Sequence, residues 1–215
     1  MKSTKPAAWS DVRVCLDGFD RAGLLGVIRN LYHANATNRR FLHARFVPTA
    51  SALEAYRALV QAAVFPPPLS QRPVRLREAS AAIADYRRST GDLSGVVDLL
   101  LTFVEAGTEQ AADLGYGDDA YFATLERKVR EVVAALNALP DSVRGEAMAR
   151  LVRLGKYQNR LGWGYGGFLG GVATKVQTCH PGRLARSVVT RSNHRMELAR
   201  PLSRALKASR RADHS

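Results

Sequence analysis

The sequence predicts an all-α protein, built as a bundle or a short stack of antiparallel helical hairpins, with about seven helices and a basic C-terminal tail. Apolar residues recur at spacings of three and four along most of the chain, which is the period of an α-helix. Prolines, glycines and short polar residues divide this pattern into segments, and no segment alternates as a strand would. No fixed-period repeat indicates a solenoid.

The length and composition set the expected domain organisation. The chain has 215 residues, of which 46% are hydrophobic, enough for one well-buried core but short for two full domains. We predict an N-terminal arm at residues 1–19, a helical domain at residues 20–167 and a Gly/Arg-rich tail at residues 168–215, either partly helical or disordered.

The first predicted hairpin lies between residues 24 and 46. Asp20 marks the start of an amphipathic helix. The apolar positions expected to lie in the core are Leu24, Leu25, Ile28, Leu31 and Tyr32. Asn35 and its polar neighbours are typical of caps and turns, so a second helix is expected to begin there and to carry Phe41, Leu42 and Phe46.

The third to fifth helices are predicted from their start and stop signals. Ser51 and Glu54 have the spacing of a capping box, which predicts the start of the third helix. The prolines at 66–68 are expected to end that helix. A fourth helix is expected to stop at Gly91, and Asp92 then stands at the N-cap of a fifth. The fifth has the clearest apolar stripe, which predicts the central core helix: Leu93, Val96, Val97, Leu100, Leu101 and Val104.

The last two predicted helices follow a glycine-containing loop at residues 107–117. Asp118 and Asp119 suit the N-terminus of the sixth helix, because carboxylates are stabilised near the positive end of the helix dipole. Pro140 precedes the seventh helix, which is expected to reach Tyr157.

The net charge of +13 is unevenly distributed. Residues 1–160 hold 22 Lys and Arg against 17 Asp and Glu, a net of +5, whereas residues 161–215 hold 10 against 2, a net of +8. This asymmetry favours a nucleic acid or another anionic partner for the tail, although a basic tail can also be merely solubilising. The candidate nucleic-acid-binding residues are Arg183, Arg186, Arg191, Arg195, Arg204, Lys207, Arg210 and Arg211.

The sequence predicts a cytoplasmic protein without a membrane span. Cys15 and Cys179 lie far apart and outside any metal-ligand spacing, which suits a reducing compartment. The N-terminus has no apolar run typical of a signal peptide. The longest apolar patch, residues 99–104, is far shorter than the roughly 20 residues that span a bilayer.

Three groups of residues resemble a family of small bacterial helical proteins catalogued only as a domain of unknown function. They are Leu31-Tyr32-x-x-Asn35-x-x-Asn38-x-x-Phe41-Leu42-x-x-Arg45-Phe46, Ala82-Ile83-x-Asp85-Tyr86, and Thr90-Gly91-Asp92 with Asp98-Leu99 and Phe103-Val104-Glu105-x-Gly107. The resemblance covers about residues 20 to 140. It implies an all-α, cytoplasmic protein without an assigned reaction, so it carries over no catalytic residue.

The candidate partner-binding residues are Arg39, Arg40, His43 and Arg45, on and around the second predicted helix. Such a cluster can hold a phosphate or a carboxylate through charge-assisted hydrogen bonds. The alternative is an ordinary solvated face. Because no catalytic constellation accompanies the helical core, we expect a non-enzymatic binding or scaffold protein with a protein partner.

Other patterns are weaker, and no cofactor or metal is predicted from them. Gly162-x-Gly164-x-x-Gly167 matches a dinucleotide-binding turn, but it lacks a preceding strand and a downstream carboxylate. A turning segment whose aromatic side chains fold back onto the bundle is the preferred interpretation. An unrecognised hydrolase or transferase, which would combine the basic corner with Asp118 or Asp119, stays as a further alternative.

Overall fold

A computed structural model describes residues 8–47, 50–67, 70 and 72–179 of the chain. Within these residues the all-α prediction is confirmed: every regular element is helical, and none is a strand. The α-helices are α1 (Trp9–Asp17), α2 (Arg21–Ala34), α3 (Ala36–Phe46), α4 (Ala50–Val64), α5 (Leu76–Thr90), α6 (Leu93–Leu114), α7 (Asp119–Ala135), α8 (Asp141–Leu154) and α9 (Gly167–Cys179). Short 3-10 segments follow α7 and α8, and a π-helical turn, Gly162–Gly166, leads into α9.

The described part of the chain therefore holds nine α-helices rather than about seven. The two additional helices form in the segments predicted to be an arm and a tail. α1 begins where the Ala8 amide donates to Asp11 Oδ2 at 2.7 Å, which satisfies a free N–H at the helix start. α9 is rich in glycine, which lowers its intrinsic helix propensity, but it packs against α8 and buries Leu169 and Val176.

Asparagine and aspartate begin the helices as predicted. Side-chain oxygens accept from the backbone amide three residues ahead at Asp20, Asn35 and Asp118, at 2.7–2.8 Å. Asp92 stands at the N-cap of α6, but its carboxylate instead accepts a hydrogen bond from the Tyr86 hydroxyl at 2.8 Å. Gly91 supplies the left-handed residue, at φ 66°, that the tight connection from α5 requires.

α6 is the central core helix, as its apolar stripe predicts. It packs against α4, α5, α7 and α8, and buried side chains occur all around it. The helix continues past the predicted loop start at Gly107 and ends at Leu114. A Cβ at Gly107 would lie 2.5 Å from Leu125 Cδ2, and the Gly107 carbonyl accepts from the Tyr121 hydroxyl at 2.8 Å. This glycine therefore lets α7 approach closely rather than ending the helix.

Charged side chains tie three helices of the bundle together. Arg150 on α8 donates to both Glu105 oxygens at 2.9 and 2.6 Å and to Asp98 Oδ1 at 2.7 Å. Arg57 on α4 donates to Asp98 Oδ2 at 2.8 and 3.0 Å. Burial lowers the pKa of Arg150, but the hydrogen bonds and charges of Glu105 and Asp98 outweigh that effect and raise it.

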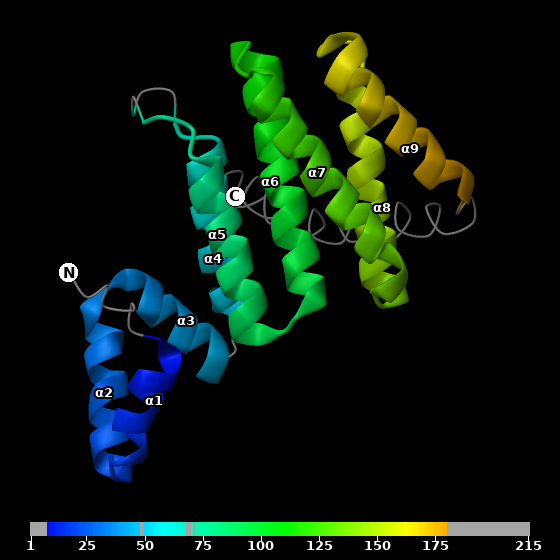
Figure 1. Ribbon diagram of the computed structural model, residues 1–215. Coiled ribbons are helices and arrows are strands. Elements are labelled where there is room, and N and C mark those ends of the chain that lie inside the picture. Colours follow the sequence, from blue (N-terminus) through cyan, green and yellow to red (C-terminus); the bar gives the residue numbers. More distant parts are fainter. Residues whose placement is uncertain (1–7, 48–49, 68–69, 71, 180–215) are drawn as a thin grey trace, which may run out of the picture.

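The helices fall into two regions (Figure 1). α4–α9 form the bundle, and α3 joins it through contacts with α5 and the buried Ala44. α1 and α2 project from the end of the bundle where α5 ends. From here on, "the arm" means residues 8–34, which contain α1 and α2, and not the shorter arm predicted at residues 1–19. None of the described helices is both long and apolar enough to cross a membrane.

Candidate functional site

The basic corner predicted as a partner surface lies on α3, where the arm meets the bundle. Its members are exposed or half-buried, but three of the four side chains are engaged within the chain. Arg45 donates to the Ser89 carbonyl of α5 at 3.4 Å, and Arg40 donates to Thr37 Oγ1 at 3.2 Å. The side chain of Arg39 has no polar partner among the described residues.

His43 belongs to the joint between α3 and α2. Its Nε2 shares a 3.1 Å hydrogen bond with the Tyr32 hydroxyl, and the two rings lie 5.4 Å apart. Asn38 adds a second link, because its Nδ2 donates to the Leu31 carbonyl at 2.8 Å. These two hydrogen bonds join α2 to α3, which gives His43 a structural role.

The arm itself exposes its apolar residues. No residue of α1 or α2 is buried. The large apolar side chains that the arm exposes are Trp9, Val12, Val14, Phe19, Leu24, Leu25, Ile28 and Leu31. Leu24, Leu25, Ile28 and Leu31 were expected in the core and are instead 38–54% exposed. That prediction was wrong because the helical period identifies an apolar face without saying what covers it.

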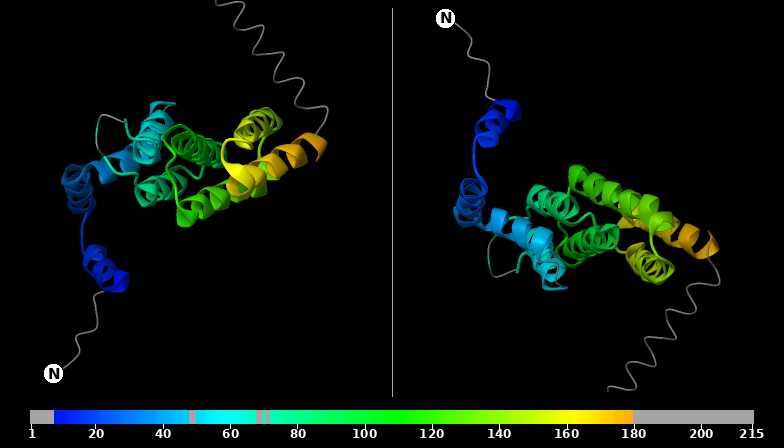
Figure 2. Two further views of the ribbon diagram at one scale, coloured as in Figure 1. Left: turned by 90° about the horizontal axis from the view of Figure 1, so that it is seen from above. Right: turned by 90° about the horizontal axis from the view of Figure 1, so that it is seen from below.

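The arm is an open pair of helices. α1 has few contacts with any other described helix, and both views in Figure 2 show it on the side of α2 away from the bundle, joined to the start of α2. The link between them is locally fixed: Asp20 caps α2, and the Phe19 ring lies against the backbone of Gly23, where a Cβ would come within 3.1 Å of it. The apolar side chains of the two helices are therefore left available to a partner.

The charge of the arm differs from that of the whole chain. Residues 8–20 hold Asp11, Asp17 and Asp20 against Arg13, a net of −2. Residues 21–34 hold two arginines and no acidic residue, a net of +2. The arm is thus neutral overall in a chain of net charge +13, and its two halves carry opposite charge.

The acid–base alternative requires the basic corner and the aspartates at the start of α7 to converge. The corner lies beside the end of α5, next to the start of α6, whereas α7 begins just beyond the end of α6. Because the 22 residues of α6 span about 33 Å, the two groups lie at opposite ends of the bundle. Asp118 caps α7, so the structure gives it a local role.

The histidines beside the corner and Asp113 near the end of α6 have partners other than a metal. His33 packs edge-on against the Tyr32 ring, and His43 bonds to the Tyr32 hydroxyl. Asp113 pairs with Arg160 at 2.9 Å. In the described ranges no group of three or more His, Cys, Asp or Glu side chains is placed to hold a metal ion.

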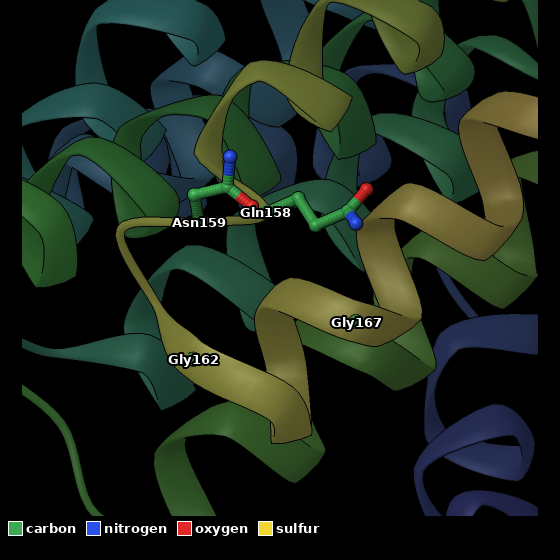
Figure 3. Close-up of a pocket in the computed structure, with 4 residues that line it drawn as sticks. All are labelled: Gln158, Asn159, Gly162 and Gly167. Carbon is green, nitrogen blue, oxygen red and sulfur yellow. The ribbon is translucent and has the colours of Figure 1, made fainter.

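The glycine-rich segment forms a small pocket rather than a phosphate-binding turn. The pocket has a volume of about 260 Å³. Four described residues line it: Gln158, Asn159, Gly162 and Gly167 (Figure 3). Gly166 and Gly170 leave no space for a Cβ against Gln158. Tyr165 folds back as predicted, is buried and shares a 2.9 Å hydrogen bond with Thr108. Packing against Gln158 therefore accounts for Gly166 and Gly170, and Gly162 adopts the left-handed conformation, at φ 73°, that favours glycine.

The candidate nucleic-acid-binding residues of the tail, from Arg183 to Arg211, lie outside the described residues. Two further carboxylates of the bundle are held in ion pairs, Asp85 with Arg88 and Glu105 with Arg150.

Comparison of the chain with protein-family models, curated proteins and solved structures finds no match. The resemblance to a family of bacterial helical proteins therefore stays a prediction. The surface that sequence reasoning missed is the apolar face of the arm. Its neutral charge balance is a property of the sequence.

Proposed function

We propose that this protein is a non-enzymatic binding or scaffold protein in which the bundle holds out the arm as a protein-binding surface. One observation carries the proposal: the arm presents large apolar side chains on two successive helices that the described chain does not cover. Large exposed apolar patches mark interaction sites in soluble proteins.

The composition and attachment of the arm support this proposal. Trp9, which is 69% exposed, is of the residue type that most often anchors protein interfaces. The joint at Tyr32 and His43 holds α2 in place before binding, so less entropy is lost when a partner docks. Arg39, half-buried on α3, the helix that packs against α2, supplies part of a polar rim.

Site-specific photo-crosslinking in the cells that make the protein tests the proposal. A photoreactive amino acid replaces Val14 on α1, which is 72% exposed, or Val133 on α7, which is 40% exposed, in otherwise identical chains. We expect discrete cross-linked protein adducts from position 14 and none from position 133. Equal labelling at both positions, or none from position 14, would overturn the proposal.

A second set of variants separates the arm from the basic corner. Arg39→Glu/Arg40→Glu reverses the corner, and Leu25→Asp/Ile28→Asp disrupts the apolar face. If the arm is the binding surface, the second pair abolishes the adducts from position 14 and the first only weakens them. If reversing the charges of Arg39 and Arg40 alone abolished the adducts, the corner would be the binding surface instead.

The charge distribution favours one alternative function, nucleic-acid binding through the tail. The net charge of +8 in residues 161–215 is its only support. It predicts an affinity that falls steeply with salt, because neutralised phosphates release counterions. Undiminished affinity for DNA and RNA in a chain ending at Cys179, compared with the full chain, would exclude this alternative.

A further inference from the structure

We infer that the partner of the arm is the arm of a second copy of this chain, so that the protein is a twofold-symmetric dimer. This inference rests on the proposed function, because it names the partner of the same surface. In the proposed arrangement, the α1 half of each arm lies against the α2 half of the other.

Helix length gives the first argument for a permanent partner. α1 has 9 residues and α2 has 14, and isolated helices below about 12–15 residues are marginal in water. Tertiary packing of an apolar face normally supplies the missing stability. No residue of either helix is buried by the described part of the chain, so we assign that packing to another molecule.

Charge identifies that molecule as a second copy. The α1 half of the arm carries −2 and the α2 half carries +2. In an isologous dimer each surface meets its symmetry mate, so a contact between the two halves occurs twice. Such pairing brings opposite charges together at both places, and the surface is complementary to itself.

The charge of the rest of the chain supports the same occupant. Two copies with a net charge of +13 each repel one another, and the neutral arm is where they can meet with least repulsion. A nucleic acid or an anionic membrane would be drawn to a strongly positive surface, and the neutral arm is not one. A partner with a strong charge of either sign would be repelled by one half of the arm.

The size of the arm agrees with that of a stable interface. A standard protein interface takes about 20–30 residues from each side, and the arm spans residues 8–34. Large apolar side chains on both α1 and α2 are 38–72% exposed. Each copy can therefore contribute both halves at once.

The mass of the full chain in solution tests the inference directly. Sedimentation equilibrium is expected to give twice the chain mass of 23.5 kDa for the wild type. Leu25→Asp/Ile28→Asp is expected to give a monomer with unchanged circular dichroism from the bundle, and Val133→Asp, a matched change on α7, is expected to remain a dimer. A monomeric wild type, or a dimer that survives Leu25→Asp/Ile28→Asp, would overturn the inference.

Charge reversal tests the pairing of the two halves. Arg21→Asp/Arg29→Asp makes both halves −2, so we expect the dissociation constant of the dimer to rise at least about tenfold at low salt. Arg77→Asp/Arg127→Asp changes the net charge equally on the bundle, outside the arm, and is expected to tighten the dimer slightly by lowering the total repulsion. Equal responses of the two variants would contradict the proposed pairing.

The two proposals fail in different ways. A monomeric wild type that still gives discrete adducts from position 14 to a different protein removes the dimer and keeps the binding function. A monomer without adducts removes both.

Discussion

The arm and the bundle present the same pattern in sequence and opposite environments in the structure. α2 and α6 both carry apolar residues at helical spacing, yet α6 buries side chains all around its axis and α2 buries none. Each apolar stripe requires a cover. The bundle finds that cover within the chain, whereas the arm, in our proposal, finds it in a second copy.

The polar groups of the two regions differ in the same way. In the bundle, Arg150, Asp98 and Glu105 form a half-buried network that joins helices. In the arm, Arg13 and Asp17 form an exposed pair 3.7 Å apart on a single helix. Charge in the bundle therefore fixes tertiary structure, whereas the ion pair in the arm stays at the surface of one helix.

The largest expected contrast comes from truncating one leucine in each region. Leu100→Ala on α6, where the side chain is 1% exposed, is expected to lower the free energy of unfolding by about 3 kcal/mol through lost burial and a cavity. Leu25 on α2 is 54% exposed, so Leu25→Ala is expected to lower the free energy of unfolding of a single chain by under about 0.5 kcal/mol. Urea denaturation followed by circular dichroism measures both.

Protein concentration serves as the control for this pair. The loss from Leu100→Ala is expected to be the same at every concentration, because its neighbours belong to the same chain. Any loss from Leu25→Ala should depend on concentration, as mass action requires for a side chain covered by a second copy. A large, concentration-independent loss from Leu25→Ala would show that the arm is covered within its own chain.

Alkaline unfolding is the next largest effect, and it is expected to arise in the bundle. Burial, helped by the hydrogen bond to Asp92, raises the pKa of Tyr86 to about 12 from its usual 10. The unfolded chain then loses this proton first, so the stabilisation is complete below pH 10 and disappears as the pH rises to about 12. The expected loss is about 2–3 kcal/mol, measured by urea denaturation at several pH values.

Tyr86→Phe isolates this contribution. Burial also raises the pKa of Tyr56, Tyr121 and Tyr165, so the variant is expected to reduce the alkaline slope without removing it. An unchanged slope would mean that the Tyr86 hydroxyl ionises equally in the folded and unfolded chain. Because the arm holds no buried residue, the double variant Leu25→Asp/Ile28→Asp should show the same alkaline slope as the wild type.

The sequence was sufficient to predict the bundle because its signals are local. Asp20, Asn35 and Asp118 cap helices where their type and position suggest. The stripe of α6 is buried from Val96 to Val104, whereas Leu93 at its start is 38% exposed. The prediction of a loop starting at Gly107 was wrong, because a glycine that allows close packing looks the same in sequence as one that ends a helix. That distinction depends on a neighbour distant in sequence, such as Leu125.

The candidate site was harder to predict than the fold. Arg40, His43 and Arg45 attract attention in sequence, but their partners Thr37, Tyr32 and Ser89 are found only once the helices are placed. The apolar face of the arm looked like core for the same reason. Burial is a property of the whole arrangement, and a periodic pattern states only which residues share a face.

Ion pairs in the two regions give the next contrast in size. Arg150→Met removes the donor to both Glu105 and Asp98 and is expected to lower the free energy of unfolding by about 2 kcal/mol, less than for a fully buried pair because the carboxylates are 34% and 26% exposed. Arg13→Met removes an exposed ion pair and is expected to change the free energy of unfolding by under about 0.5 kcal/mol. Denaturation in low and high salt distinguishes them: only a surface contribution is screened. Equal losses would contradict the structural role of the network.

The smallest contrast compares two glycines within helices. Replacing them with alanine is expected to change stability in opposite directions. A Cβ at Gly107 would lie 2.5 Å from Leu125 Cδ2, so Gly107→Ala is expected to cost about 1–2 kcal/mol of stability by overpacking α6 against α7. Nothing lies within 4 Å of a Cβ at Gly26 on α2, so Gly26→Ala should stabilise that helix by about 0.5–1 kcal/mol. Amide hydrogen exchange resolves the two effects: protection is expected to fall in α6 and α7 in the first variant and to rise in α2 in the second. Reduced protection in α2, together with a weaker dimer, would mean that another backbone approaches Gly26 in the assembled protein, and would place it at the contact between the two arms.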